Sequence, residues 1–119
     1  MKRILLVEDN EENRYLITFI LEKNNCEVLI AKDGKTGIEL ANKEKPDAIL
    51  MDIQLPDING LEVTKRIRAS KSDGKVPIIA ITSYAMVGDK ERSLEAGCNG
   101  YIEKPINPET FMSELHKYI

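Results

Sequence analysis

The sequence predicts an α/β fold in which a parallel sheet is covered by helices on both faces. Short runs rich in Ile, Leu and Val alternate with longer amphipathic segments along the 119 residues, which is typical of strand and helix units that build a parallel sheet. Two of the short runs are apolar nearly throughout, as strands buried on both faces are. The length is that of one domain. We therefore expect a single domain over residues 1–119.

Five short runs are the expected strands. Each is apolar or β-branched and is bounded by polar or turn-forming residues. They are RILLV (3–7), EVLIA (27–31), DAILM (47–51), PIIAIT (77–82) and GYIE (100–103). An amphipathic segment follows each run, so the chain consists of five consecutive strand and helix units.

Four of the amphipathic segments have the apolar spacing of ordinary helices. In the first, Leu16, Ile17, Ile20 and Leu21 recur at helical intervals, and Asn10 is placed to cap the helix. The second is expected over 35–44 and stops before Pro46. The third opens after Gly60 and carries Leu61, Val63 and Ile67. The last is expected over 108–119, with Phe111, Met112, Leu115 and Ile119 on its apolar side.

The segment 85–96, AMVGDKERSLEA, predicts the least secure helix. It holds Gly88 in its interior, has a polar middle and offers few apolar anchors. Gly97 is placed to end it as a C-cap. Weakly anchored elements are the ones that rearrange most readily.

Composition and charge exclude several classes of function. The net charge is −3, from 17 basic and 20 acidic residues, and the basic residues form no stripe, which disfavours direct nucleic-acid binding. The apolar runs are too short to span a bilayer, and the start has no signal-peptide pattern, so we expect a cytoplasmic protein that does not contact a membrane. Cys26 and Cys98 are expected as buried thiols, and His116 as a solvated helix residue.

Polar residues gather where the expected strands end. Glu8 and Asp9 follow the first strand, Asp52 the third, and Lys104 the fifth, while the fourth ends on Thr82 and Ser83. In an open parallel sheet, ligands bind at the carboxyl ends of the strands. Each residue also has a simpler explanation: the acid pair suits a helix N-terminus, Asp52 a turn, Thr82 a strand and Lys104 the surface. Their coincidence on one edge favours a site.

Three converging carboxylates predict a cation. They would repel one another and destabilise the fold unless a positive ion lay among them. The thiolate and imidazole ligands that zinc prefers are not at hand. An all-oxygen set therefore favours Mg²⁺, with Mn²⁺ able to substitute.

A divalent ion beside a lysine and a hydroxyl predicts phosphoryl binding. The ion and the Lys104 ammonium would neutralise phosphoryl oxygens, and the Thr82 hydroxyl would donate to another. Carboxylates form acyl phosphates. Asp52 is the expected nucleophile because it ends the strand between the Glu8 and Asp9 pair and the Thr82 and Lys104 pair.

At these residues the chain resembles the receiver domains of two-component response regulators. The motifs that carry the resemblance are ILLVEDNEENR, PDAILMDIQLPDINGLEV, PIIAITSYA and AGCNGYIEKPI, and together they cover the whole chain. The chain is similar to stand-alone receivers related to DivK and to receivers of hybrid histidine kinases. The resemblance implies a flavodoxin-like fold with strand order 2-1-3-4-5.

The family resemblance implies a role for each site residue. Asp52 is the implied phospho-acceptor, with a phosphohistidine of a sensor histidine kinase or histidine phosphotransferase as donor, and Lys104 is the implied phosphate-binding lysine. Asp9 would bind the metal directly, Asp52 would share it, Glu8 would bind it through water, and Gln54 through its backbone carbonyl.

The resemblance also implies a switch. Thr82 would move to the phosphate and Tyr101 would turn inward on phosphorylation. The alternative for Tyr101, which we favour less, is a half-exposed strand aromatic that packs on the neighbouring helix and never switches. Tyr84 would shield the acyl phosphate from water, and the Lys104–Pro105 bond would be cis.

The implied output is a surface made by segments 85–96, 100–103 and 108–119. Exposed Tyr101 and Ile102, with Lys90 and Arg92 nearby, are candidate contacts for a downstream protein. We expect a monomer or a weak phosphorylation-dependent dimer.

Two other functions compete with the switch. One is a small magnesium-dependent aspartyl-phosphate phosphatase, which the short loops disfavour because they leave little room for a substrate pocket. The other is an interaction module that no longer needs phosphorylation. The joint presence of Asp9, Asp52, Thr82 and Lys104 disfavours the second.

Overall fold

The computed structural model describes residues 1–70, 75–83 and 89–119. Its elements alternate as the sequence predicts. The strands are β1 (Lys2–Val7), β2 (Cys26–Ala31), β3 (Ala48–Asp52), β4 (Ile78–Thr82) and β5 (Gly100–Glu103). The helices are α1 (Glu11–Lys23), α2 (Gly34–Glu44), α3 (Gly60–Ala69), α4 (Asp89–Ala96) and α5 (Phe111–His116).

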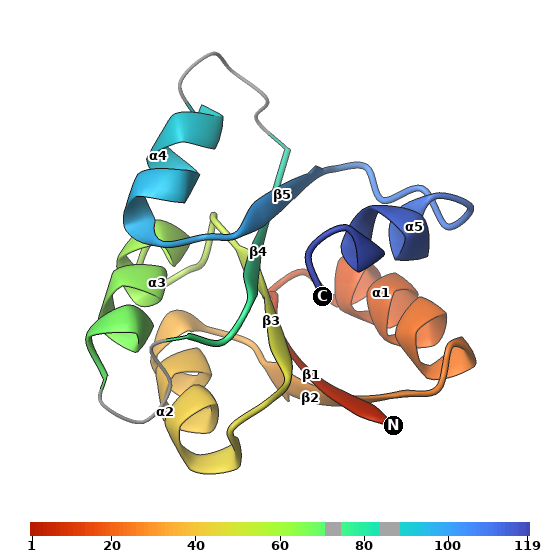
Figure 1. The fold of residues 1–119 in the computed structure, drawn as a ribbon, viewed down its shortest axis with the longest axis horizontal. Coiled ribbons are helices and arrows are strands. Elements are labelled where there is room, and N and C mark those ends of the chain that lie inside the picture. Colours follow the sequence, from red (N-terminus) through yellow and green to blue (C-terminus); the bar gives the residue numbers. More distant parts are fainter. Residues whose placement is uncertain (71–74, 84–88) are drawn as a thin grey trace.

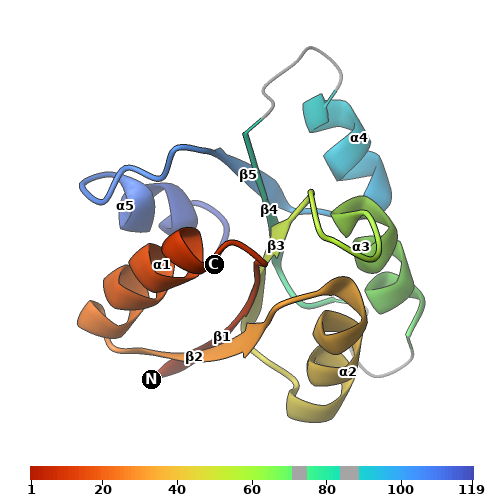
Figure 2. The ribbon, with the colours of Figure 1, turned by 180° about the vertical axis from the view of Figure 1, so that it is seen from behind.

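The five strands form one parallel sheet in the order β2-β1-β3-β4-β5. Helices α1 and α5 cover one face of this sheet, and α2, α3 and α4 cover the other (Figure 1; Figure 2 gives the view from behind). This is the flavodoxin-like arrangement with order 2-1-3-4-5. The expected fold class is confirmed.

Alternate strand residues build two apolar cores. Along β1, Ile4 and Leu6 pack with α1 and α5, whereas Leu5 and Val7 pack with α2 and α3. All five residues of β3 and of β4 are buried. Full burial of the central strands explains why their sequences are continuous apolar runs rather than alternating ones.

Several local predictions are confirmed. Asn10 caps α1, because its side chain accepts a hydrogen bond from the Asn13 amide at 2.9 Å. Gly97 ends α4 with φ +113°, a conformation that favours glycine. Cys26 and Cys98 are buried free thiols. Among the described helices, the longest has 13 residues, and none has the length and apolarity to cross a bilayer.

Two expectations about the C-terminal part are wrong. Ile102 is buried rather than exposed, because on β5 it faces the core formed with Phe111 and Leu115. Helix α5 is shorter than 108–119 and begins at Phe111. Its expected first turn is replaced by a turn at Asn107, whose side chain accepts a hydrogen bond from the Glu109 amide at 2.9 Å.

Arg68, near the end of α3, joins three chain segments. Its Nε donates to the Gly97 carbonyl at 2.9 Å, and another guanidinium nitrogen donates to Asn99 Oδ1 at 2.7 Å. A third hydrogen bond reaches the Val76 carbonyl just before β4, at 2.5 Å. One side chain therefore fixes the α4–β5 turn against α3 and the start of β4.

Candidate functional site

The candidate site is an open pocket of about 610 Å³ at the carboxyl edge of the sheet. It is lined by residues from the ends of β1, β3, β4 and β5 and from the start of α1. These are Glu8, Asp9, Asn10, Glu11, Asn13, Asp52, Gln54, Ser83 and Lys104. The position agrees with the rule for ligand sites in open parallel sheets.

The register of β1 against β3 brings the acids together. Val7 lies beside Met51 in the parallel pair. The residues that follow these two, Glu8 and Asp52, therefore also lie side by side. One carboxylate oxygen from each of Glu8, Asp9 and Asp52 falls within 4.8 Å of the others. Glu8 and Asp52 are 0% and 2% exposed, whereas Asp9 is exposed. The predicted carboxylate cluster is confirmed as a geometric fact.

Lys104 is the basic group that contacts the cluster among the described residues. Its Nζ lies 3.0 Å from Glu8 Oε1 and 3.4 Å from Asp52 Oδ2. The other Asp52 oxygen, Oδ1, accepts a hydrogen bond from the backbone amide of Gln54 at 3.1 Å. One ammonium thus contacts two of the three clustered carboxylates, and the cluster keeps an excess of negative charge.

Glu8 carries the electrostatic cost of this arrangement. Burial, reinforced by the hydrogen bond and charge of neighbouring Asp52 and opposed by Lys104, raises the pKa of Glu8 from 4.5 to about 7. Glu8 Oε1 is buried and is paired with the Lys104 ammonium at 3.0 Å. The same ammonium is shared with Asp52 at 3.4 Å, so one positive charge serves more than one carboxylate. The cluster is therefore suited to a further cation.

The donor set fits a hard divalent cation. Glu8, Asp9 and Asp52 offer carboxylate oxygens, and Gln54 lines the same pocket. Oxygen donors suit Mg²⁺ and Mn²⁺, and an open pocket leaves room for the waters that Mg²⁺ retains. His116 is exposed on α5 and does not line the pocket.

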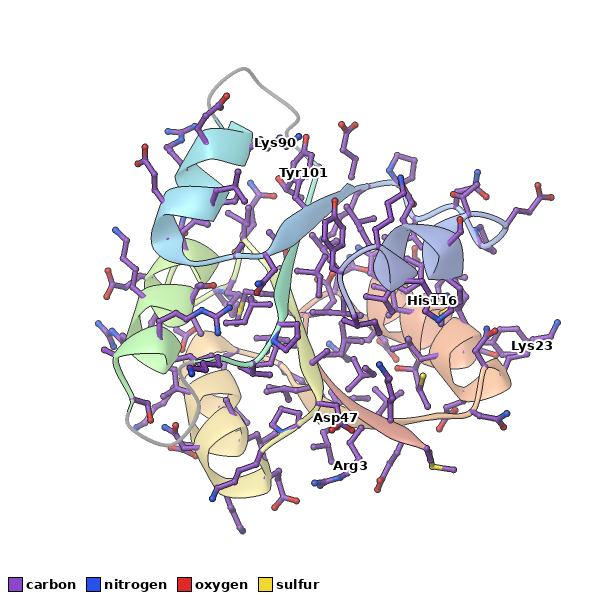
Figure 3. The ribbon with its side chains drawn as sticks, in the orientation of Figure 1. Arg3, Lys23, Asp47, Lys90, Tyr101 and His116 are labelled. Carbon is purple, nitrogen blue, oxygen red and sulfur yellow. The ribbon has the colours of Figure 1, made fainter. Side chains whose placement is uncertain are left out.

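The other expected site residues lie as follows. Thr82 ends β4 and is 2% exposed, and it is one position past Ile81, the neighbour of Asp52 in the sheet. Tyr101 is half-buried beside α4, and its hydroxyl donates to Glu103 Oε1 at 3.1 Å (Figure 3). The Lys104–Pro105 bond is cis, as expected. Tyr84 lies outside the described residues.

Sequence reasoning missed two groups that shape the pocket. Arg14 on α1 donates to the Asp9 carbonyl at 2.7 Å and to the Glu8 carbonyl at 3.3 Å, and so holds the backbone of the acidic pair. Gly60 lies so close under β3 that a Cβ there would be 2.1 Å from the Asp52 carbonyl oxygen. The glycine after Asn59 was a visible signal, whereas the reach of Arg14 becomes clear only in three dimensions.

The sheet order, the acidic pocket at the strand ends and the lysine after β5 together define the class of this protein. The chain belongs to the response regulator receiver domain family of two-component signalling, whose model matches residues 4–116. It is similar to the polar-differentiation response regulator DivK of Brucella anthropi, with 41% identity over 118 residues that cover 99% of this chain and 96% of that protein.

Solved structures give the same result. The chemotaxis response regulator CheY4 of Vibrio cholerae superposes with a TM-score of 0.95 at 28% identity, covering 100% of this chain and 99% of that one. A receiver domain of a sensor histidine kinase from Pseudomonas aeruginosa superposes with a TM-score of 0.90 at 38% identity, covering 98% of this chain and 96% of that one. That second structure holds a magnesium ion coordinated in its active site cleft.

Proposed function

We propose that this receiver domain is a phosphorylatable switch that accepts a phosphoryl group on Asp52. The donor is a phosphohistidine on a sensor histidine kinase or histidine phosphotransferase, and the reaction takes place in the cytoplasm. The observation that carries the proposal is the placement of Asp52 at the end of a fully buried strand, with Lys104 3.4 Å from its Oδ2. A rigid strand end holds the nucleophile in position.

In the transfer, a carboxylate oxygen of Asp52 attacks phosphorus. The new O–P bond forms as the N–P bond of the phosphohistidine breaks, and the imidazole nitrogen keeps the bonding electrons and takes up a proton. The Lys104 ammonium neutralises charge on the phosphoryl oxygens, and the Gln54 amide, 3.1 Å from Asp52 Oδ1, orients the carboxylate.

The metal site is proposed from the same residues. Asp9, Asp52 and the Gln54 carbonyl would hold Mg²⁺ or Mn²⁺ directly, and Glu8 through water. The ion, when bound, supplies positive charge that offsets the carboxylates and the incoming phosphoryl oxygens. The three carboxylate oxygens within 4.8 Å of one another, two of them from buried side chains, support this assignment.

Thr82 and Tyr101 are the proposed switch. Thr82 would donate to the acyl phosphate, and Tyr101 would leave Glu103 and turn inward. An open groove of about 250 Å³ beside Tyr101, between α4 and β5, supports a role in binding a downstream protein. Lys90 and the 49% exposed Leu94 line this groove. The protein itself would be a monomer or a weak phosphorylation-dependent dimer.

The test is labelling with acetyl phosphate and with a phosphohistidine donor, followed by intact-protein mass spectrometry. Wild-type protein should gain one phosphoryl group in the presence of Mg²⁺, and Asp52→Asn should gain none. Repeated turnover of acetyl phosphate without accumulation of phosphoprotein would favour a phosphatase. Signalling output that survives Asp52→Asn would favour a phosphorylation-independent module.

A further inference from the structure

The N-terminus of α2 is capped by acids from two different parts of the chain. Asp33, the local cap, accepts a hydrogen bond from the Thr36 amide at 2.7 Å. Asp57, from the loop between β3 and α3, accepts from the Gly34 amide at 2.8 Å and from the Lys35 amide at 3.0 Å. The first amides of a helix have no partner within the helix. Asp57 therefore takes up two donors that Asp33 leaves free.

The cap made by Asp57 is an ionic one. The Gly34 amide, with smaller contributions from other backbone amides, holds the pKa of Asp57 below its usual value. The carboxylate also faces the positive end of the α2 dipole. The helix backbone thus favours the charged side chain although that side chain is exposed to solvent.

The loop that carries Asp57 also carries Gln54, and it is fixed at its base and at its tip. At the base, the Gly60 amide donates to the Ile53 carbonyl at 2.8 Å, and the Ile53 amide donates to the Ile81 carbonyl at 3.2 Å. Nearer the tip, Asp57 ties the loop to α2. Gln54 lies between these two anchors, so the direction of its backbone depends on both.

We propose that Asp57 is a positioning residue for the metal and phosphoryl site, which it serves by holding the β3–α3 loop so that the Gln54 backbone keeps its place beside Asp52. The inference rests on the proposed function, because it gives Gln54 a metal-binding carbonyl. Asp57 does not contact the pocket and acts through Gln54. Groups that orient metal ligands in this way commonly change metal affinity when removed.

The chain offers a matched control. Asp57→Ala removes both acceptors, whereas Asp57→Asn keeps one carbonyl oxygen and should recover part of the effect. Asp33→Ala removes the other cap of the same helix and should destabilise α2 to a comparable degree. It leaves the β3–α3 loop attached.

Two measurements on the folded variants test the inference. Hydrogen exchange of the Gln54 amide, in protein without metal, should accelerate in Asp57→Ala and stay unchanged in Asp33→Ala. The Mg²⁺ dissociation constant from calorimetry should rise roughly tenfold in Asp57→Ala and stay at the wild-type value in Asp33→Ala.

Equal behaviour of Asp57→Ala and Asp33→Ala in both measurements would overturn the role of Asp57. Failure of the wild-type protein to bind Mg²⁺ would instead overturn the proposed metal site. The exchange comparison would still decide whether Asp57 fixes the Gln54 backbone, so the two failures are distinguishable.

Discussion

The two ends of β1 carry charge in opposite ways. At the amino end, Arg3 lies 2.9 Å from Glu44 Oε1 and 3.4 Å from Glu27 Oε2, and its backbone amide donates to Asp47 at 2.8 Å. These side chains are partly exposed, and Figure 3 shows Arg3 and Asp47 at the same edge of the molecule. At the carboxyl end, Glu8 is buried in a cluster with an excess of negative charge.

The difference separates structural charge from functional charge. Partly exposed ion pairs cost little and contribute little. Buried like charges destabilise the fold and persist only where something else requires them. At the carboxyl end of β1, a bound cation would therefore offset repulsion between carboxylates, which is not the case at the amino end.

The largest loss of stability should follow removal of the Lys104 ammonium, which contacts the buried acids at the carboxyl end of β1. Lys104→Met leaves Glu8 and Asp52 without the cation that contacts both, and the free energy of unfolding should fall by about 3 kcal/mol. Urea titration at pH 8 in EDTA measures it. Lys65→Met, at an exposed position of α3, is the control and should change stability little. Equal losses in the two variants would remove the contrast between buried and exposed charge.

The next effect is a pH dependence from Glu8. Its pKa of about 7 in the folded protein exceeds the 4.5 of the free side chain, so the folded state binds the proton more tightly. Stability contributed by Glu8 is therefore present below pH 4.5 and is lost as the pH rises through 7. Between pH 5 and pH 8 we expect a loss of about 2 to 3 kcal/mol in metal-free protein. In Glu8→Gln this loss should be absent, and a wild-type profile that is flat between pH 5 and 8 would contradict the assignment.

Mg²⁺ should stabilise the protein through the carboxylates at the carboxyl end of β1. At ten times its dissociation constant, Mg²⁺ should raise the free energy of unfolding by about 1.4 kcal/mol through mass action. The gain should shrink near pH 5, where protons compete with the metal for the carboxylates. Thermal unfolding with and without Mg²⁺ measures it. Asp9→Asn should lose most of the gain, and full retention of the gain in that variant would argue against Asp9 as a ligand.

The smallest effect belongs to the amino end. Arg3→Ala should lower the free energy of unfolding by about 1 kcal/mol, because the ion pairs it loses are partly exposed. Its Mg²⁺ affinity should equal that of wild-type protein. A changed Mg²⁺ affinity, measured by calorimetry, would show that the two ends of β1 are coupled.

The fold was predictable because local signals agreed with one another. Continuous apolar runs marked the buried strands, and Asn10 marked the start of α1. Parallel strands bring their carboxyl ends to one edge, so the acids at Glu8 and Asp52 could be placed together before any coordinates. The family assignment of the chain is likewise confirmed.

What sequence reasoning missed depends on contacts between distant segments. Asp57 reads as a turn residue in LPDING, and its bond to Gly34 spans 23 positions. Ile102 reads as a surface residue of an edge strand, and only the packing of α5 shows that it is buried. The roles of Thr82, Tyr101 and the metal ligands stay predictions, since they concern the phosphorylated and metal-bound forms of the protein.

Hydrogen bonds from Arg68 limit how α4 is able to move. Its guanidinium donates to the Gly97 carbonyl and to Asn99 Oδ1, and so fixes the turn that directly follows the carboxyl end of this helix. Because the carboxyl end of α4 is held, a tilt of this helix would displace its residues by an amount that increases toward Asp89. On phosphorylation, a spin label at Glu91 should therefore move farther than one at Glu95. The helix would pivot about the turn that Arg68 of α3 holds.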